Sequence, residues 1–131
     1  MVKDGYVSFE TAKLLKEKGY DGYCFKAYST DGTIDDAIEL CGEVDICNSE
    51  CTEGNVAAPT LQDAARWLRE QYELLISINP TLDKGGWLCV MYYIWDMDDI
   101  EKDAEKSCLY SIEHYNECAD DSIRHCLEKL I

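Results

Sequence analysis

The sequence predicts an α+β fold, in which a small antiparallel sheet centred on residues 87–95 carries about three helices packed mainly on one face. The stretch 87–95, WLCVMYYIW, contains no charge, glycine or proline, which is typical of a buried central strand. Three other segments repeat apolar residues at helical spacing, and they lie near residues 8–18, 60–72 and 116–130. A chain of 131 residues can bury about two thirds of its unfolded surface, so we expect residues 1–131 to form a single domain.

The first helix has a start signal and a stop signal. Ser8 is suited to cap its N-terminus, and Gly19 is suited to end it, because glycine adopts the left-handed conformation at little cost. Residues 23–28, YCFKAY, then predict a short strand. Residues 29–58 have the weakest pattern, with a helical turn expected across 34–40.

The second helix begins after Thr60, which is suited to be its N-cap, with Asp63 placed three residues later as in a capping box. Its apolar stripe is formed by Leu61, Ala64, Ala65, Leu68 and Tyr72. Trp67 lies outside this stripe, which predicts that it belongs to a second contact surface.

The rest of the chain predicts a hairpin, a further strand and a final helix. Apolar residues alternate over 74–79, and the turn signal in 83–86, DKGG, predicts that this strand pairs antiparallel with 87–95. The acidic run 96–105 is expected to form a loop or a short exposed helix, and residues 108–114 to add a strand. Asn116 is the expected N-cap of the last helix.

The charge of the chain excludes several classes of partner. Asp and Glu number 27 against 12 Lys and Arg, giving a formal net charge of −15. This field repels nucleic acids and anionic membranes, so we expect neither direct nucleic-acid binding nor membrane binding. A local pocket could still hold an anionic ligand, because salt screens each charge beyond about 10 Å.

Targeting signals and cysteine usage indicate the compartment. The sequence has no pattern of a signal peptide and no apolar run of about 20 residues, so we expect a cytoplasmic protein. In that compartment the eight cysteines are expected to be thiols rather than disulfides.

The sequence predicts neither a metal site nor a catalytic centre, and no cofactor. Cys41, Cys47 and Cys51 are spaced C-x5-C-x3-C, which leaves a zinc loop open as an alternative to structural thiols, but no CxxC pair accompanies them. Cys118 and His125 share the last helix, where two turns separate them, too far for a nucleophile and its base. The acidic run 96–105 lacks the glycine and ligand spacing of an EF-hand.

The candidate site is the aromatic face of the central strand. Side chains alternate along a strand, so Trp87, Met91, Tyr93 and Trp95 share one face, and both faces of this strand are apolar. We expect the aromatic face to bind a ligand or a partner, and the alternatives are an oligomer interface and ordinary core. The predicted site residues are Trp67, Lys84, Trp87, Met91, Tyr93 and Trp95.

Three segments resemble small uncharacterised proteins of Bacteroides-type bacteria and their phages. These segments are YVSFETAKLLKEKGYD at 6–21, APTLQDAARWLRE at 58–70 and CLEKLI at 126–131. They consist of helix caps and helix cores, so the resemblance transfers no catalytic residue. It implies an origin in a phage or mobile element and a location inside the bacterial host.

These observations predict a non-catalytic accessory protein that binds and sequesters a small intracellular molecule, with a nucleotide-derived signal of host defence as one ligand class. The alternative is an acidic inhibitor of a host protein, whose carboxylates could resemble DNA. Enzyme activity ranks third, because no catalytic constellation is present. We also expect a homodimer or higher homo-oligomer, because a second copy is the commonest cover for a leftover apolar face.

Overall fold

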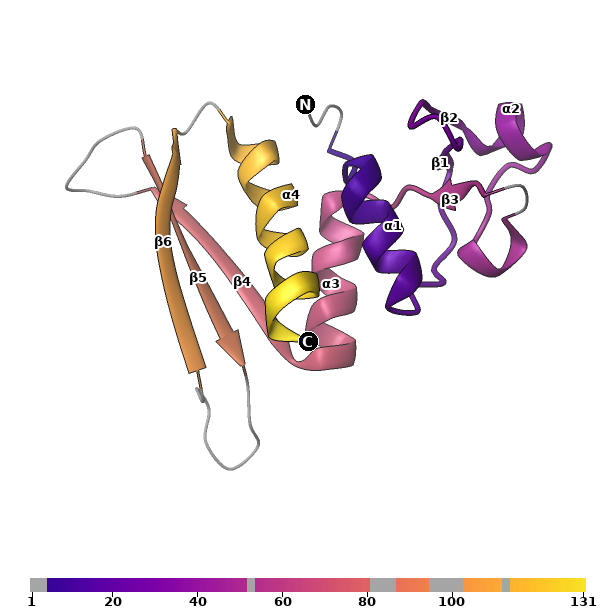
Figure 1. The fold of residues 1–131 in the computed structure, drawn as a ribbon. Coiled ribbons are helices and arrows are strands. Elements are labelled where there is room, and N and C mark those ends of the chain that lie inside the picture. Colours follow the sequence, from indigo (N-terminus) through magenta and orange to yellow (C-terminus); the bar gives the residue numbers. More distant parts are fainter. Residues whose placement is uncertain (1–4, 52–53, 81–86, 95–102, 112–113) are drawn as a thin grey trace. The chain divides into compact units, whose positions relative to one another are not determined.

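The structure, a computed structural model, describes residues 5–51, 54–80, 87–94, 103–111 and 114–131 (Figure 1). These residues form two compact units, Met1–Ala64 and Ala65–Ile131. Helices and antiparallel sheets occur in both units, and the predicted α+β class with a small antiparallel sheet over 87–94 is confirmed. The single-domain organisation stays a prediction.

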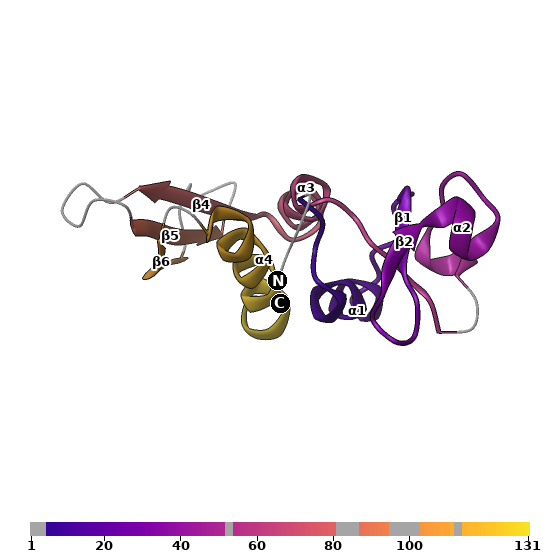
Figure 2. The ribbon, with the colours of Figure 1, turned by 90° about the horizontal axis from the view of Figure 1, so that it is seen from above.

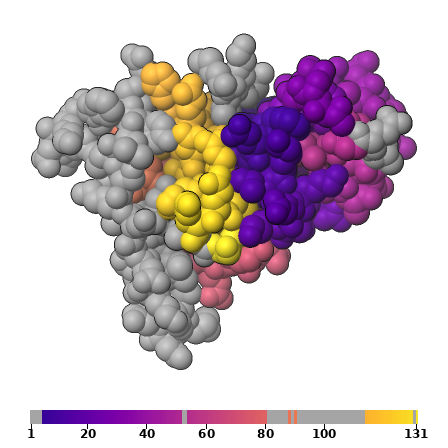
Figure 3. Space-filling model, viewed as in Figure 1, coloured from indigo at the N-terminus to yellow at the C-terminus, as the bar shows by residue number. Residues whose placement is uncertain are grey.

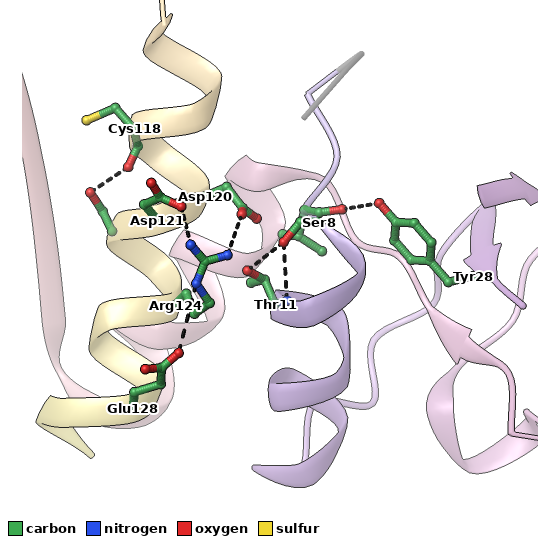
Figure 4. Close-up of polar contacts among 10 residues, drawn as sticks. Ser8, Thr11, Tyr28, Cys118, Asp120, Asp121, Arg124 and Glu128 are labelled. Carbon is green, nitrogen blue, oxygen red and sulfur yellow. Dashed lines mark hydrogen bonds and ion pairs between the residues drawn. The ribbon is translucent and has the colours of Figure 1, made fainter. Parts of the chain in front are cut away.

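The first helix of unit 1, α1 (Phe9–Glu17), begins and ends where the sequence predicts. Thr11 donates its backbone N–H to Ser8 Oγ at 3.3 Å, which satisfies one of the amides that a helix N-terminus leaves without a partner (Figure 4). After the C-cap, Gly19 has a φ of +99°, where a side chain would be strained. Ala12 and Leu15 are fully buried, so α1 presents its apolar side to the core of unit 1.

The remaining part of unit 1 is built on three short strands. Strand β1 (Lys26–Tyr28) lies between β2 (Ile34–Asp36) and β3 (Val56–Ala57), and both pairings are antiparallel. The helix α2 (Ala37–Cys41) and the 3₁₀ turn η1 (Asn48–Glu50) complete the unit. One core cluster of the unit consists of Ala27, Ala37 and Ile46, with Leu40, Cys41 and Cys51 packed against it.

Asn48 joins three segments of unit 1 that are distant in sequence. Its side chain is buried, its Nδ2 donates to the carbonyl oxygen of Tyr20 at 2.8 Å, and its Oδ1 accepts from the N–H of Ala57 at 2.9 Å. The segment after α1 and strand β3 are therefore held by one amide side chain. Buried backbone groups are costly to leave without a partner, so this side chain supports the whole arrangement.

We predict that Asn48→Ala lowers the free energy of unfolding by about 2 kcal/mol, because two buried backbone groups lose their partner. Urea denaturation followed by circular dichroism measures this loss. Asn55→Ala is the matched control, since its Nδ2 contacts only a sulfur, Cys41 Sγ at 4.0 Å, among the contacts that the structure describes. Equal stability of the two variants would contradict the assigned role of Asn48.

Helix α3 (Leu61–Tyr72) leads directly into the sheet of unit 2. Asp63 donates its N–H to Thr60 Oγ1 at 3.1 Å, which confirms Thr60 as the predicted N-cap. After Tyr72, the single residue Glu73 adopts a left-handed φ of 56° and strand β4 (Leu74–Pro80) follows at once. The chain thus changes from helix to strand without a loop.

The sheet of unit 2 contains β4, β5 (Trp87–Ile94) and β6 (Asp103–Ser111), with β5 in the centre and antiparallel to both neighbours (Figure 1). This confirms the predicted pairing of the strands over 74–79 and 87–95. The predicted turn at 83–86 lies outside the described residues. Helix α4 (Tyr115–His125) continues into a short π-helix, η3 (Cys126–Leu130), and α4 packs against all three strands.

Two predicted boundaries are wrong. Strand β6 begins at Asp103 rather than at residue 108, so the end of the acidic run forms strand instead of loop. Pairing with β5 compensates for the poor strand propensity of these charged residues, and this gain cannot be seen in the local sequence. The N-cap of α4 is His114 and not Asn116, and no side-chain capping hydrogen bond forms there.

Candidate functional site

The pairing of the strands in unit 2 assigns residues to the two faces of the sheet. In an antiparallel ladder, residues that stand directly opposite each other lie on the same face. Leu74, Leu88 and Val90 belong to one face through the pairs Leu74–Ile94, Pro80–Leu88 and Ile78–Val90. We call the opposite side the second face, and it contains the paired positions Leu75–Tyr93, Ser77–Met91 and Asn79–Cys89.

The first face is covered within unit 2. Leu74, Leu88 and Val90 are 1%, 2% and 1% exposed, and α4 lies on one side of the sheet (Figure 2). The buried residues Ile123 and Leu127 provide the apolar side of α4–η3. Of the central strand, Leu88 and Val90 are the residues whose side chains the structure describes (Figure 3). One face of β5 is therefore core.

The β4 residues of the second face are partly apolar and partly polar. Leu75 and Ser77 are half-buried and Asn79 is exposed, with Asn79 Nδ2 donating to Ser77 Oγ at 2.6 Å. These residues stand opposite Tyr93, Met91 and Cys89 of β5. The described part of this face thus combines an apolar side chain with groups that can form hydrogen bonds.

A bulge in β6 changes which of its residues belong to the second face. Leu88 pairs with Tyr110 but Val90 pairs with Ser107, so two residues of β6, Cys108 and Leu109, stand opposite one residue of β5. In a regular ladder continued from the Leu88–Tyr110 pair, Ser107 would stand opposite Met91. Because of the bulge, Lys106 stands there instead. The bulge therefore assigns a cationic position to the centre of the second face.

The predicted site residues have different positions in the structure. Trp87, Met91 and Tyr93 occupy alternate positions of β5 and belong to the second face by register. Trp67 is half-buried on α3, where its ring meets that of Tyr72 edge-on, with centroids 5.3 Å apart. The structure thus gives Trp67 an aromatic contact within its own helix. Lys84 and Trp95 lie outside the described residues.

Sequence reasoning missed three residues of the second face: Leu75, Ser77 and Lys106. Leu75 and Ser77 could have been found, because they alternate with Leu74, Ile76 and Ile78 in the predicted strand. Lys106 carried no such signal, since its face depends on the bulge and on a strand that begins earlier than its local sequence indicates.

Helix α4, which covers the first face, contains a charge network centred on Arg124. Arg124 Nη1 lies 3.4 Å from Asp120 Oδ2, Nη2 donates to Asp121 Oδ1, and Nε lies 3.9 Å from Glu128 Oε1 (Figure 4). The side chain of Asp120 is only 2% exposed, whereas Arg124 is 26% exposed. A guanidinium can compensate a buried carboxylate in this way, which fits a role in fixing α4 rather than in binding a ligand.

We predict that Arg124→Met lowers the free energy of unfolding by about 1–3 kcal/mol, because the buried carboxylate of Asp120 loses a charged partner. Thermal or urea denaturation measures the change. Lys129→Met is the control, since it removes an exposed positive charge near the end of the same segment. The assignment would be contradicted if both substitutions had the same small effect.

Burial suppresses the ionisation of three cysteine thiols, two in unit 1 and one in α4. Burial raises the pKa of Cys24 to about 12, and it also raises the pKa of Cys51 and Cys118, so these thiols stay protonated at neutral pH. Cys47 Sγ lies 3.2 Å from Ser49 Oγ and donates to Glu50 Oε1 at 3.3 Å. Within the described ranges, no three His, Cys, Asp or Glu side chains gather as a metal site would require.

Comparisons with family models, curated proteins and solved structures find no match to this chain. Among the described residues, no helix has the length and apolar character needed to cross a membrane. The function must therefore be inferred from the geometry of the second face and from the charge of the chain.

Proposed function

We propose that the protein is a non-catalytic binding protein that holds a small intracellular molecule on the second face of the β4–β5–β6 sheet. The observation that carries this proposal is the register of β5: Leu88 and Val90 are buried on the face that α4 covers, so Trp87, Met91 and Tyr93 belong to the other face. Aromatic and methionine positions on one sheet face suit a flat ligand such as a nucleobase, because rings stack on bases and methionine adapts to irregular shapes.

Lys106 supports an anionic or phosphorylated ligand. The net charge of −15 opposes binding of an anion in general, but a single cationic position opposite Met91 provides a local counter-charge within the screening length of about 10 Å. A nucleotide-derived molecule combines both features, a ring for the aromatic positions and a phosphate for Lys106. The proposed setting is the bacterial cytoplasm during infection by a phage or transfer of a mobile element, where such molecules act as host-defence signals.

A homodimer is part of the same proposal. An apolar sheet face on a small protein is commonly covered by the identical face of a second copy, and a ligand can be enclosed between the two. The half-buried residues Leu75 and Ser77 would then lie at the border of the contact. Light scattering at high protein concentration tests this directly, because a mass of one chain would exclude the dimer.

The second candidate function is the inhibition of a host protein by the acidic surface. The formal charge of −15 favours it, because outward carboxylates can imitate the phosphate spacing of DNA. It differs from the first candidate in the residues that matter. Charge reversal should abolish inhibition by the acidic surface, whereas aromatic truncation should abolish binding at the second face.

We predict that Trp87→Ala or Trp95→Ala weakens ligand binding by about 2 kcal/mol, because truncating a large aromatic side chain in a contact removes much of its binding free energy. Calorimetry against a panel of linear and cyclic nucleotides measures the affinity. Charge reversal at Asp98 or Asp99 is the control and should alter mainly the salt dependence of binding.

Thermal melting of the same variants separates a site from a core. Truncation of a core tryptophan would lower the free energy of unfolding by about 3–5 kcal/mol. Variants that keep their melting temperature and lose binding support the proposal. Folded variants that bind every nucleotide as the wild type does, or a wild type that binds none, would refute it.

A further inference from the structure

Unit 1 exposes several large apolar side chains, none of which belongs to the second face. Tyr23, Phe25 and Val44 are 63%, 66% and 69% exposed, and Ile38 is 48% exposed. Exposed aromatic residues that cluster are uncommon on a protein surface without a partner. We call these four residues the Tyr23–Phe25 surface.

Backbone pairing brings the segments that carry these residues next to one another. Cys24 and Ile46 form an isolated antiparallel bridge, with N–H to O distances of 2.8 and 2.9 Å in the two directions. Both of these residues are buried, whereas the neighbours of Cys24 on either side, Tyr23 and Phe25, are exposed. Phe25 also accepts a backbone hydrogen bond from Ala37 at 2.7 Å, and Ile38 follows Ala37 directly.

Acidic groups lie near Tyr23 of this surface. Glu50, and after it Cys47, Asp45 and Asp21, raise the pKa of the Tyr23 hydroxyl above its ordinary value, which reflects their proximity to the ring. The carboxylates of Asp21, Asp45 and Glu50 belong to exposed residues. Asp21 Oδ1 also accepts the N–H of Ser49 at 2.7 Å, which holds one carboxylate in position next to the 3₁₀ turn.

Few basic residues lie near this surface in the sequence. Residues 27–65 contain no lysine, arginine or histidine. The nearest described cation in sequence is Lys26, whose Nζ lies 3.3 Å from Asp36 Oδ1 and 5.5 Å from the centroid of the Tyr6 ring. The surface therefore combines apolar contact area with an excess of negative charge.

This combination selects one kind of partner. A second copy would place the same carboxylates against each other, and nucleic acid would be repelled. An arginine or lysine, in contrast, can stack on an exposed aromatic ring and pair with the carboxylates beside it. We propose that the Tyr23–Phe25 surface docks a basic segment of another protein, with a cationic side chain on Tyr23 and an apolar side chain over Phe25.

Fluorescence anisotropy tests this proposal. The full-length protein is titrated into a labelled peptide that alternates arginine and leucine, at about 0.15 M salt, where long-range attraction is screened. Tyr23→Ala and Phe25→Ala should each weaken binding about tenfold. Tyr115→Ala is the matched control, because it removes an exposed aromatic ring of unit 2, and it should bind as the wild type does.

A second pair of variants and a second peptide separate docking from bulk charge attraction. Asp45→Asn should weaken binding, whereas Glu70→Gln, an exposed acidic residue of α3, should not. A peptide that alternates arginine and glycine should bind more weakly than the arginine–leucine peptide. Equal binding by Tyr23→Ala and Tyr115→Ala, or by the two peptides, would overturn the proposal in favour of nonspecific attraction.

This surface is independent of the ligand proposed for the sheet of unit 2. Tyr23→Ala should leave nucleotide binding unchanged, and Trp87→Ala should leave peptide binding unchanged. Loss of self-association in Tyr23→Ala, measured by analytical ultracentrifugation against a wild type that associates, would assign the surface to a second copy and overturn the proposed partner.

Discussion

The alternation of residues along β5 is the constraint on which the sheet of unit 2 depends. A strand with apolar residues at every position must have both faces covered, yet one helix, α4, can cover only one of them. Burial of Leu88 and Val90 decides which face that is. A slip of one residue in the pairing would exchange the two faces completely, so the register of β4, β5 and β6 also determines which residues are available to a ligand.

Unit 1 combines buried apolar residues with buried polar interactions. Its strands are only two or three residues long, and one of its core clusters consists of Ala27, Ala37 and Ile46. The amide of Asn48 and the hydroxyl of Tyr28, which donates to the carbonyl oxygen of Val7 at 2.7 Å, connect segments that are distant in sequence. Buried hydrogen bonds of this kind specify one arrangement because the alternatives leave polar groups without partners.

Local signals in the sequence were sufficient for the helix starts at Ser8 and Thr60 and for the central strand. Each of these depends on residues within one turn of helix or on an uninterrupted apolar run. The beginning of β6, its bulge and the short strands β2 and β3 were not predicted, because each forms by pairing with another strand and its own residues carry little strand signal.

The sequence predicted the candidate site only in part. Alternation was enough to place Trp87, Met91 and Tyr93 on one face, but it could not show that Lys106 stands opposite Met91. The aromatic residues of unit 1 were not recognised as a surface either. The sequence predicted that Tyr23 and Phe25 belong to a strand, but β1 begins only at Lys26, and both residues are exposed beside the buried bridge between Cys24 and Ile46.

Two surfaces with different chemistry thus follow from the same acidic chain. The second face of the sheet offers aromatic positions and one lysine, which suits a flat anionic molecule. The Tyr23–Phe25 surface offers aromatic rings among carboxylates, which suits a basic polypeptide. The two surfaces belong to different compact units, so a substitution in one surface leaves the contact residues of the other intact.

The most direct test of the central claim is to block the second face at Ser77, which stands opposite Met91 and is half-buried on the edge strand β4. Ser77→Glu introduces a larger, negatively charged side chain there, and Gln71→Glu adds the same charge at an exposed position of α3. We predict that Ser77→Glu keeps the melting temperature of the wild type and loses nucleotide binding in calorimetry, while Gln71→Glu retains it. Undiminished binding by a folded Ser77→Glu variant would contradict the claim that the second face is the site.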